Sequence, residues 1–112
     1  MTIELAWSDR ALRRLEELGD FVAQRDPAAA ARLVETLFDQ VGRLADFPRM
    51  GRVFRGATTD SVREMLFGQY KVYYLLEEAN PGGRPERVTI LTVRHSREAP
   101  ASLDAVLDDG AA

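Results

Sequence analysis

The first part of the chain predicts a short strand followed by a helix. Hydrophobic and polar side chains alternate over residues 2–7, which is the two-residue period of a strand with one buried face. Ser8-Asp9 then provides a helix start, because the serine oxygen can accept from a free backbone N–H and the acid suits the helix dipole. From there Leu15, Val22 and their apolar neighbours recur at helical spacing, which predicts a helix that runs to about Gln24.

A second helix is expected directly after the first. Asp26-Pro27 combines an N-cap acceptor with a proline whose missing N–H costs nothing at the first helical position. Apolar side chains follow on one face, and the helix should stop near Phe47 because Pro48 cannot continue it. The connection between the helices is only a few residues long, so they should fold back as an antiparallel hairpin.

The second half of the chain has the pattern of strands. Residues 48–60 show no clear period and contain two glycines, which indicates a loop. Residues 61–67, 70–77 and 87–94 alternate or are rich in β-branched and aromatic side chains, and short turn sequences separate them.

Strict alternation assigns the side chains of these strands to two faces. In the second of them Tyr70 and Tyr74 share a face and Tyr73 takes the other. The last strand divides into one face with Val88, Ile90, Thr92 and Arg94 and another with Thr89, Leu91, Val93 and His95.

Together these elements predict an α+β fold. An N-terminal strand and an antiparallel helix hairpin precede a three-stranded antiparallel sheet, in the order β-α-α-β-β-β. Tight turns make sequential strands antiparallel, and one face of the sheet must cover the apolar side of the hairpin. Residues 1–97 should form one domain, and residues 98–112 an acidic C-terminal tail with a weak helical pattern.

Composition excludes several classes of protein. The chain has 112 residues, of which 46% are hydrophobic and 29% charged, as in a globular domain. It has no cysteine and a single histidine, so we expect no disulfide, no metal centre and no cofactor. Because no apolar run is long enough to cross a bilayer and the start lacks a signal-peptide pattern, we expect a cytoplasmic protein without a membrane partner.

Charge is unevenly distributed. The formal net charge is −3, but residues 49–97 carry nine basic and five acidic side chains, a balance of +4. Residues 98–112 carry four acids and no base. Proteins that settle among RNA phosphates are usually strongly basic, whereas the pI of this chain is about 5.2. The charge therefore favours a protein target over bulk RNA, with a local cationic region for contact.

Several short sequences, taken in order, resemble the ParE/RelE superfamily of bacterial toxins from type II toxin–antitoxin pairs. They are Trp7-Ser8, Pro27, Phe47-Pro48-x-x-Gly51-Arg52, Arg63-Glu64, Tyr70-Lys71-Val72-Tyr73-Tyr74 and Val93-Arg94-His95-Ser96-Arg97. The Pro-x-x-Gly-Arg loop and the terminal Val-x-His-x-Arg are similar to the ParE branch. That resemblance implies a toxin that poisons DNA gyrase without being an enzyme and is silenced by a ParD-like antitoxin, in a heterotetramer or a larger assembly. The RelE branch implies instead an endonuclease that cuts mRNA on the ribosome.

The candidate site residues fit either branch. A metal-free ribonuclease needs a base, an acid and cations for the phosphate, and these roles suit Glu64, His95, Arg97 and Arg63. The contact residues of a toxin that only binds its target would be Arg94, His95, Arg97, Arg63 and Tyr70. A purely structural alternative also exists, in which His95 and Arg97 cap the sheet edge and Tyr70 packs in the core.

A further set of residues is expected to contact the antitoxin. We expect a groove between the hairpin and the sheet, filled by an amphipathic antitoxin segment as a helix or an added strand. Leu15 and Val22 are the candidate apolar contacts, and Arg49, Arg52 and Arg55, which repeat every third residue, are candidates for a basic arm. A third possibility is a non-toxic member that acts only through antitoxin binding.

Overall fold

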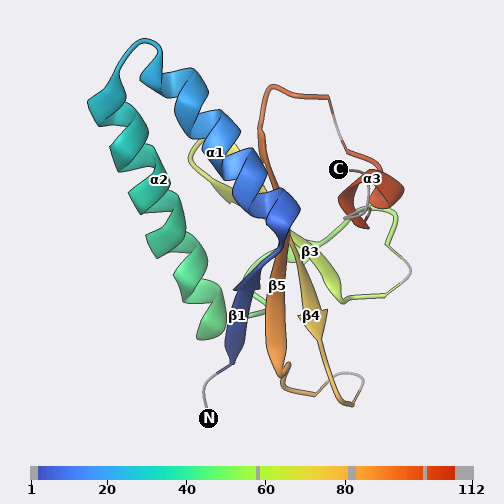
Figure 1. Cartoon of the computed structure of the whole chain (residues 1–112). Helices are drawn as coiled ribbons and strands as arrows, with labels where there is room; N and C mark the ends of the chain where they lie inside the picture. Colours follow the sequence, from blue (N-terminus) through green and yellow to red (C-terminus); the bar gives the residue numbers. More distant parts are fainter. Residues whose placement is uncertain (1–2, 58, 81–82, 100, 108–112) are drawn as a thin grey trace.

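The computed structural model describes residues 3–57, 59–80, 83–99 and 101–107. Thr2 of the expected first strand and the last five residues of the expected tail lie outside this part. The elements, in chain order, are β1 (Glu4–Trp7), α1 (Asp9–Ala23), α2 (Pro27–Gly42), the 3-10 turn η1 (Arg43–Ala45), β2 (Arg52–Val53), β3 (Val62–Phe67), β4 (Tyr70–Glu77), β5 (Arg87–His95) and α3 (Leu103–Leu107) (Figure 1).

The two long helices form the expected antiparallel hairpin (Figure 1). Ser8 Oγ caps α1 by accepting from the Ala11 N–H at 3.0 Å, and Asp26 Oδ1 caps α2 by accepting from the Ala29 N–H at 3.0 Å. The predicted end of the second helix near Phe47 is too late. The α-helix ends at Gly42 and tightens into η1, which brings the chain to the turn before β2.

The sheet has five strands in the order β1-β5-β4-β3-β2. Its centre is the predicted antiparallel series β3-β4-β5, and the N-terminal strand adds to one edge by pairing in parallel with β5. At the other edge Arg52 and Val53 pair with Glu64 and Arg63, so the prediction of an unpaired loop over residues 48–60 is wrong for these two residues. A two-residue strand is too short to leave a periodic pattern in the sequence.

A β-bulge interrupts the alternation of β5. Tyr73 is opposite Thr92, but the next residue, Tyr74, is opposite Ile90, so Leu91 is an extra residue without a partner on β4. The strict alternation predicted for the last strand holds through Leu91, which lies on the opposite face from Ile90, and is wrong for the residues after it. The prediction for β4 is confirmed, with Tyr74 in the core under the helices and Tyr73 in the core on the opposite face.

The bulge decides which side chains of β5 face the helices. Val93 packs in the same core as Val88 and Ile90, although strict alternation places it on the other face. His95, two residues beyond Val93, consequently lies on the helix side, where its ring packs against Tyr70.

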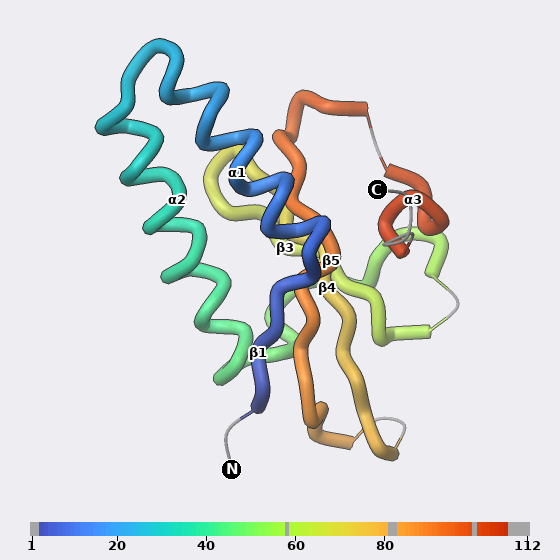
Figure 2. The backbone as a smooth tube through the Cα atoms, in the orientation of Figure 1, coloured from blue at the N-terminus to red at the C-terminus, as the bar shows by residue number. Residues whose placement is uncertain are grey.

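Both faces of the sheet carry a hydrophobic core. The larger core lies between the sheet and the hairpin. The smaller one comprises Phe54, Val62, Tyr73, Leu91 and Val106. Figure 2 shows α3 beside the chain around β3 and away from the hairpin, so residues 101–107 cover this second face.

Gly51 holds the chain before β2 against β4. Its N–H donates to Tyr74 Oη at 2.9 Å, and Arg63 Nη1 donates to its carbonyl at 2.8 Å. A Cβ at this position would lie 2.5 Å from Tyr74 Oη, so only glycine fits. Burial raises the pKa of the Tyr74 hydroxyl, while the Gly51 N–H and the nearby Arg63 act in the opposite direction.

Candidate partner-binding groove

A groove of about 800 Å³ lies between α1 and the adjoining ends of β4 and β5, on the sheet face that the helices cover. Apolar and charged side chains both line it. These residues are Arg14, Glu17, Leu18, Phe21, Val22, Arg25, Asp26, Gln69, Tyr70, His95, Arg97 and Glu98. The structure thus contains a groove between the hairpin and the sheet, as the sequence analysis predicts.

His95 is held firmly at the sheet end of this groove. Its ring meets Tyr70 edge-on, with ring centroids 5.2 Å apart and an interplanar angle of 84°. Nδ1 accepts from the Arg97 backbone N–H at 3.0 Å, and Nε2 lies 3.2 Å from Gln69 Oε1. Because Nδ1 is an acceptor, the neutral ring carries its proton on Nε2, which donates to Gln69. Both ring nitrogens are therefore occupied.

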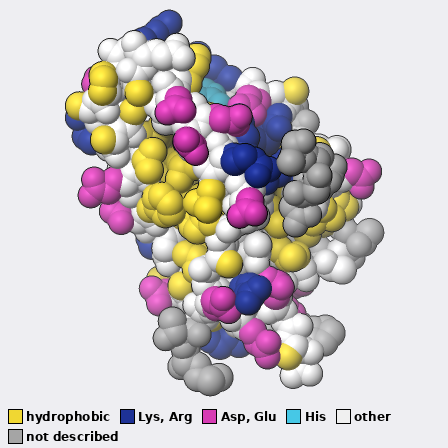
Figure 3. Space-filling view, in the orientation of Figure 1, with side chains coloured by type: hydrophobic (Ala, Val, Ile, Leu, Met, Phe, Trp, Pro, Cys, Tyr) yellow, Lys and Arg dark blue, Asp and Glu magenta, His cyan; other side chains and the backbone are white. Residues whose placement is uncertain are grey.

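A network of charges forms the rim of the groove next to the C-terminal segment. Arg14 on α1 donates from Nε to the Val93 carbonyl at 3.1 Å and pairs through its two terminal nitrogens with Glu17 and Glu98. Arg94 pairs with the other oxygen of Glu98 at 3.3 Å. Figure 3 shows basic and acidic side chains side by side between α1 and the C-terminal segment, next to a hydrophobic area over the hairpin and β1.

The structure brings several of the predicted contact residues together. Tyr70, His95, Arg97 and Val22 all line the groove. Arg94 does not line it, but it is linked to the rim through Glu98. The predicted target contacts at the end of β5 and one predicted antitoxin contact thus share one surface.

Glu64 lies on the opposite face of the sheet from His95. It follows Val62 at the two-residue spacing of β3, beside the core that contains Tyr73, and forms an ion pair with Arg52. Burial raises the pKa of Tyr73, and the negative charge of Glu64 raises it further. The four candidates for a ribonuclease therefore do not form one cluster.

Arg63 is also separate from His95. Its side chain is 11% exposed and donates to the carbonyls of Asp60, Arg49 and Gly51 at distances of 2.8–3.2 Å. In the register of the sheet it is opposite Tyr74, four residues along β4 from the strand position that pairs with His95. The side chain of Arg63 therefore holds the segment before β2, through the carbonyls of Arg49 and Gly51.

The other predicted antitoxin contacts are dispersed. Leu15 is 3% exposed and belongs to the core under the hairpin. Arg49 pairs with Glu78, and Arg52 pairs with Glu64. Each of these two guanidinium groups pairs with a carboxylate of its own, and Arg55 lies exposed in the segment between β2 and β3.

The sequence analysis named four of the twelve groove residues as site candidates and missed the other eight, which are Arg14, Glu17, Leu18, Phe21, Arg25, Asp26, Gln69 and Glu98. Phe21 is 68% exposed, although it belongs to a helix with a well-defined apolar face. Its position three residues after Leu18, at the edge of that face, is the signal that identifies it. Gln69 and Glu98 carried no such signal, because their roles depend on the positions of His95 and Arg94.

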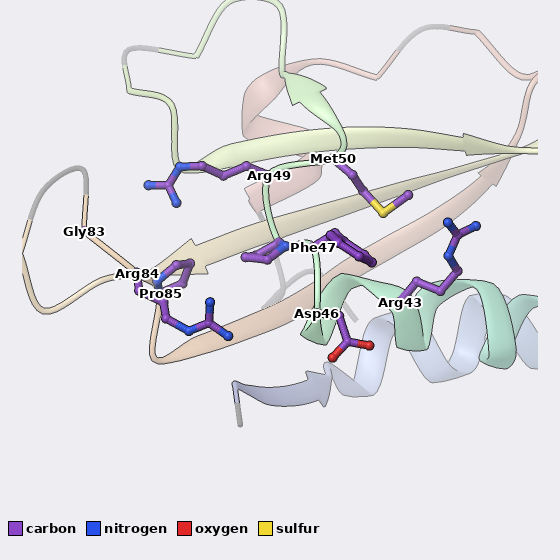
Figure 4. A pocket seen from close by; sticks show the side chains of 9 residues that line it. Arg43, Asp46, Phe47, Arg49, Met50, Gly83, Arg84 and Pro85 are labelled. Carbon is purple, nitrogen blue, oxygen red and sulfur yellow. The ribbon is translucent and has the colours of Figure 1, made fainter. Parts of the chain in front are cut away.

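A second pocket, of about 700 Å³, lies at the opposite end of the sheet (Figure 4). Phe47 and Met50 lie in its middle, with Arg43 on one side and Arg49 and Arg84 on the other. Of the predicted site residues it contains only Arg49, whose guanidinium is paired with Glu78. We therefore regard the groove beside α1 as the candidate functional site.

The described residues contain neither a cluster of metal-ligand side chains nor a helix that could span a bilayer. No three His, Asp or Glu side chains among them are grouped as metal ligands would be. The described helices are also too short or too polar to cross a bilayer.

Comparison with solved structures defines the class of the fold. A chain of the chromosomal ParDE toxin–antitoxin system of Pseudomonas aeruginosa is similar with a TM-score of 0.65 and 19% identity, covering 83% of this chain and 95% of that one. A free-state arginine double variant of the Escherichia coli toxin RelE is similar with a TM-score of 0.57 and 18% identity, covering 87% of this chain and 86% of that one. A chain of the Mycobacterium tuberculosis RelBE2 toxin–antitoxin complex is similar with a TM-score of 0.54 and 23% identity, covering 85% of this chain and 99% of that one. The fold is that of the RelE and ParE toxins.

Sequence comparison identifies the family. The model of the ParE toxin of the type II toxin–antitoxin system parDE matches residues 5–100. "Putative toxin Y4kP" of Sinorhizobium fredii is 36% identical over 94 residues, which cover 84% of this chain and 88% of that protein. The chain belongs to the ParE toxin family and is the toxin of a ParDE-type type II toxin–antitoxin system.

Proposed function

We propose that this toxin inhibits DNA gyrase by blocking the religation of cut DNA, and that a ParD-like antitoxin neutralises it by binding in the groove beside α1. The placement of the candidate residues carries the proposal. Tyr70, His95 and Arg97 gather at a groove with apolar side chains, whereas Glu64 lies on the other face. A general base and a general acid must reach the same substrate, so this arrangement favours contact with a protein over cleavage of RNA.

The shape of the groove suits an amphipathic helix. Leu18, Phe21 and Val22 lie at helical spacing along the wall that α1 provides. A helix with leucine or valine on one face can bury these side chains, in the helix-in-groove mode of recognition. Such a helix would also cover His95 and Arg97 and thereby prevent their contact with gyrase. We expect the complex to be a heterotetramer or a larger assembly in the cytoplasm.

A supercoiling assay with purified gyrase tests the target. The toxin should inhibit supercoiling at micromolar concentration and cause cleaved DNA to accumulate. Replacement of Arg97 by alanine should weaken inhibition at least about tenfold, because a charged side chain at the centre of a contact is worth more than about 1.4 kcal/mol. Arg32→Ala, on the exposed surface of α2, is the matched control and should inhibit like the wild type. Absence of inhibition by the wild type would contradict the proposal.

Two other outcomes identify the alternatives. New cleavage ends on translated mRNA, detected by primer extension and lost in His95→Ala and Arg97→Ala, would instead identify a RelE-type endonuclease. Induced expression that leaves growth unchanged, in the absence of antitoxin, would identify a non-toxic member that acts only through antitoxin binding.

A further inference from the structure

Glu98 is held between two arginines of different elements. Its Oε1 lies 2.6 Å from Arg14 Nη2 on α1, and its Oε2 lies 3.3 Å from Arg94 Nε on β5. The three side chains are 27%, 25% and 33% exposed for Arg14, Arg94 and Glu98, so the cluster is accessible from solvent. Two guanidinium groups that meet at one carboxylate form a carboxylate-binding position, and Glu98 occupies it within this chain.

Glu98 can leave this position without opening either core. It belongs to neither hydrophobic cluster, and its backbone N–H donates to the His95 carbonyl at 3.0 Å in a local turn. The segment that follows is anchored farther on, by the burial of Val106 and by a hydrogen bond from Arg10 Nη1 to the Val106 carbonyl at 3.3 Å. A rotation of the Glu98 side chain would therefore free Arg14 Nη2 and Arg94 Nε while α3 stays in place and while Arg94 Nη2 keeps its bond to the Ala99 carbonyl at 2.9 Å.

The surroundings of the arginine pair indicate what would replace Glu98. Arg14 and Glu98 line the same groove as Phe21, which is 68% exposed, and Arg25 and Arg97 add positive charge to that groove. The acidic residues of the groove already have roles, since Glu17 pairs with Arg14 and Asp26 caps α2. This combination matches an amphipathic helix with an apolar face and a carboxylate at its flank.

We propose that Arg14 and Arg94 form a carboxylate site at the rim of the antitoxin-binding groove, and that Glu98 occupies this site until a carboxylate of the antitoxin helix displaces it. This inference rests on the proposed binding of the antitoxin in the groove. The apparent affinity of the toxin for its partner equals the intrinsic affinity multiplied by the fraction of toxin molecules whose carboxylate site is free. Glu98 thus weakens the complex, and the partner must carry an acidic residue to overcome it.

Two synthetic peptides serve as probes. One is a fluorescein-labelled amphipathic helix with leucines on one face and glutamates along its flank, and the other has glutamines in place of the glutamates. Fluorescence anisotropy measures their affinity for the full chain. Glu98→Gln should bind the glutamate peptide about fivefold more tightly than the wild type, the gain expected for freeing a partly exposed arginine pair. The glutamine peptide should show no such gain.

Matched variants separate a specific site from a change in net charge. Glu16→Gln removes the same charge from an exposed position of α1 outside the groove and should leave both affinities unchanged. Adding Arg14→Gln to Glu98→Gln should abolish the gain. Equal gains in Glu98→Gln and Glu16→Gln, equal gains for both peptides, or no binding of either peptide would each overturn the inference.

A further variant distinguishes failure of the carboxylate site from failure of the groove. Phe21→Ser should weaken both peptides in every background, because both bury their apolar face against α1. If Glu98→Gln favours the glutamate peptide while Phe21→Ser has no effect, the arginine site stands and antitoxin binding in the groove is refuted. Gyrase inhibition is measured without any peptide, so its outcome is independent of the test of the arginine site and of the test of the groove.

Discussion

The hydroxyl of Tyr74 should contribute more to the free energy of unfolding than a typical hydrogen bond does. Tyr74 is fully buried, and its Oη accepts from the Gly51 N–H at 2.9 Å. Replacement by phenylalanine removes this acceptor and leaves a buried backbone N–H without a partner. A buried donor left unsatisfied costs about 1–3 kcal/mol, so we expect Tyr74→Phe to lower the free energy of unfolding by about 2 kcal/mol.

The expected change in melting temperature follows from the size of the domain. A chain of about 100 residues loses roughly 4 °C for each kcal/mol, so Tyr74→Phe should melt about 8 °C below the wild type. Urea denaturation followed by circular dichroism gives the same free energy independently, and its m-value should not change.

Tyr70→Phe is the matched control for this prediction. It removes the same atom from a side chain that is only partly buried and whose ring packs against His95. We expect it to change stability by less than about 0.5 kcal/mol. If the two variants lose the same stability, the bond between Tyr74 and Gly51 does not fix the chain before β2, and our explanation of this region is wrong.

Three further predictions concern the two faces of the sheet. Gly51→Ala should destabilise the protein by more than about 2 kcal/mol, because its Cβ would lie 2.5 Å from Tyr74 Oη; a wild-type urea midpoint in this variant would contradict the close approach. Val106→Ala should cost about 2 kcal/mol and Leu107→Ala almost nothing, because the first side chain is 1% exposed and the second 42%; thermal unfolding of both variants tests whether α3 seals the second core. Burial raises the pKa of Tyr73 and Tyr74 above the 10.0 of an unfolded tyrosine. The stability that these two protonated hydroxyls contribute should therefore be complete below about pH 10 and be lost as the pH rises through their folded-state pKa values. Urea midpoints at about pH 8 and about pH 11 should therefore differ less in Tyr73→Phe than in the wild type, and equal differences would refute this assignment.

Local patterns in the sequence were sufficient to predict the helix hairpin and the three central strands. The N-cap residues Ser8 and Asp26 act within a single turn, and the antiparallel strands are neighbours along the chain. The positions of β1 and β2 depend on pairing with strands elsewhere in the chain, which no local period reveals. This is why the fold class was predictable and the complete sheet was not.

One inserted residue limited the prediction of the site. Leu91 looks like an ordinary strand residue, and only the register against β4 shows that it has no partner. The extra residue moves every later side chain of β5 to the opposite face of the sheet. Strict alternation therefore placed His95 on the wrong face. Of the site candidates that line the groove, Tyr70 and Val22 lie on elements whose side chains keep the predicted faces, whereas His95 and Arg97 follow the bulge.

The parallel edge of the sheet has a consequence for how the chain is made. Leu5 pairs with Val88, so the first strand finds its neighbour only after more than 80 further residues have been synthesised. Pairing over such a sequence separation is slow, because a long loop must close before the contact is gained. A nascent chain can form the helix hairpin and the β3-β4 pair early, but β1 has no strand to pair with until β5 emerges. The parallel edge of the sheet in this toxin can therefore form only after residues 87–90 have been synthesised.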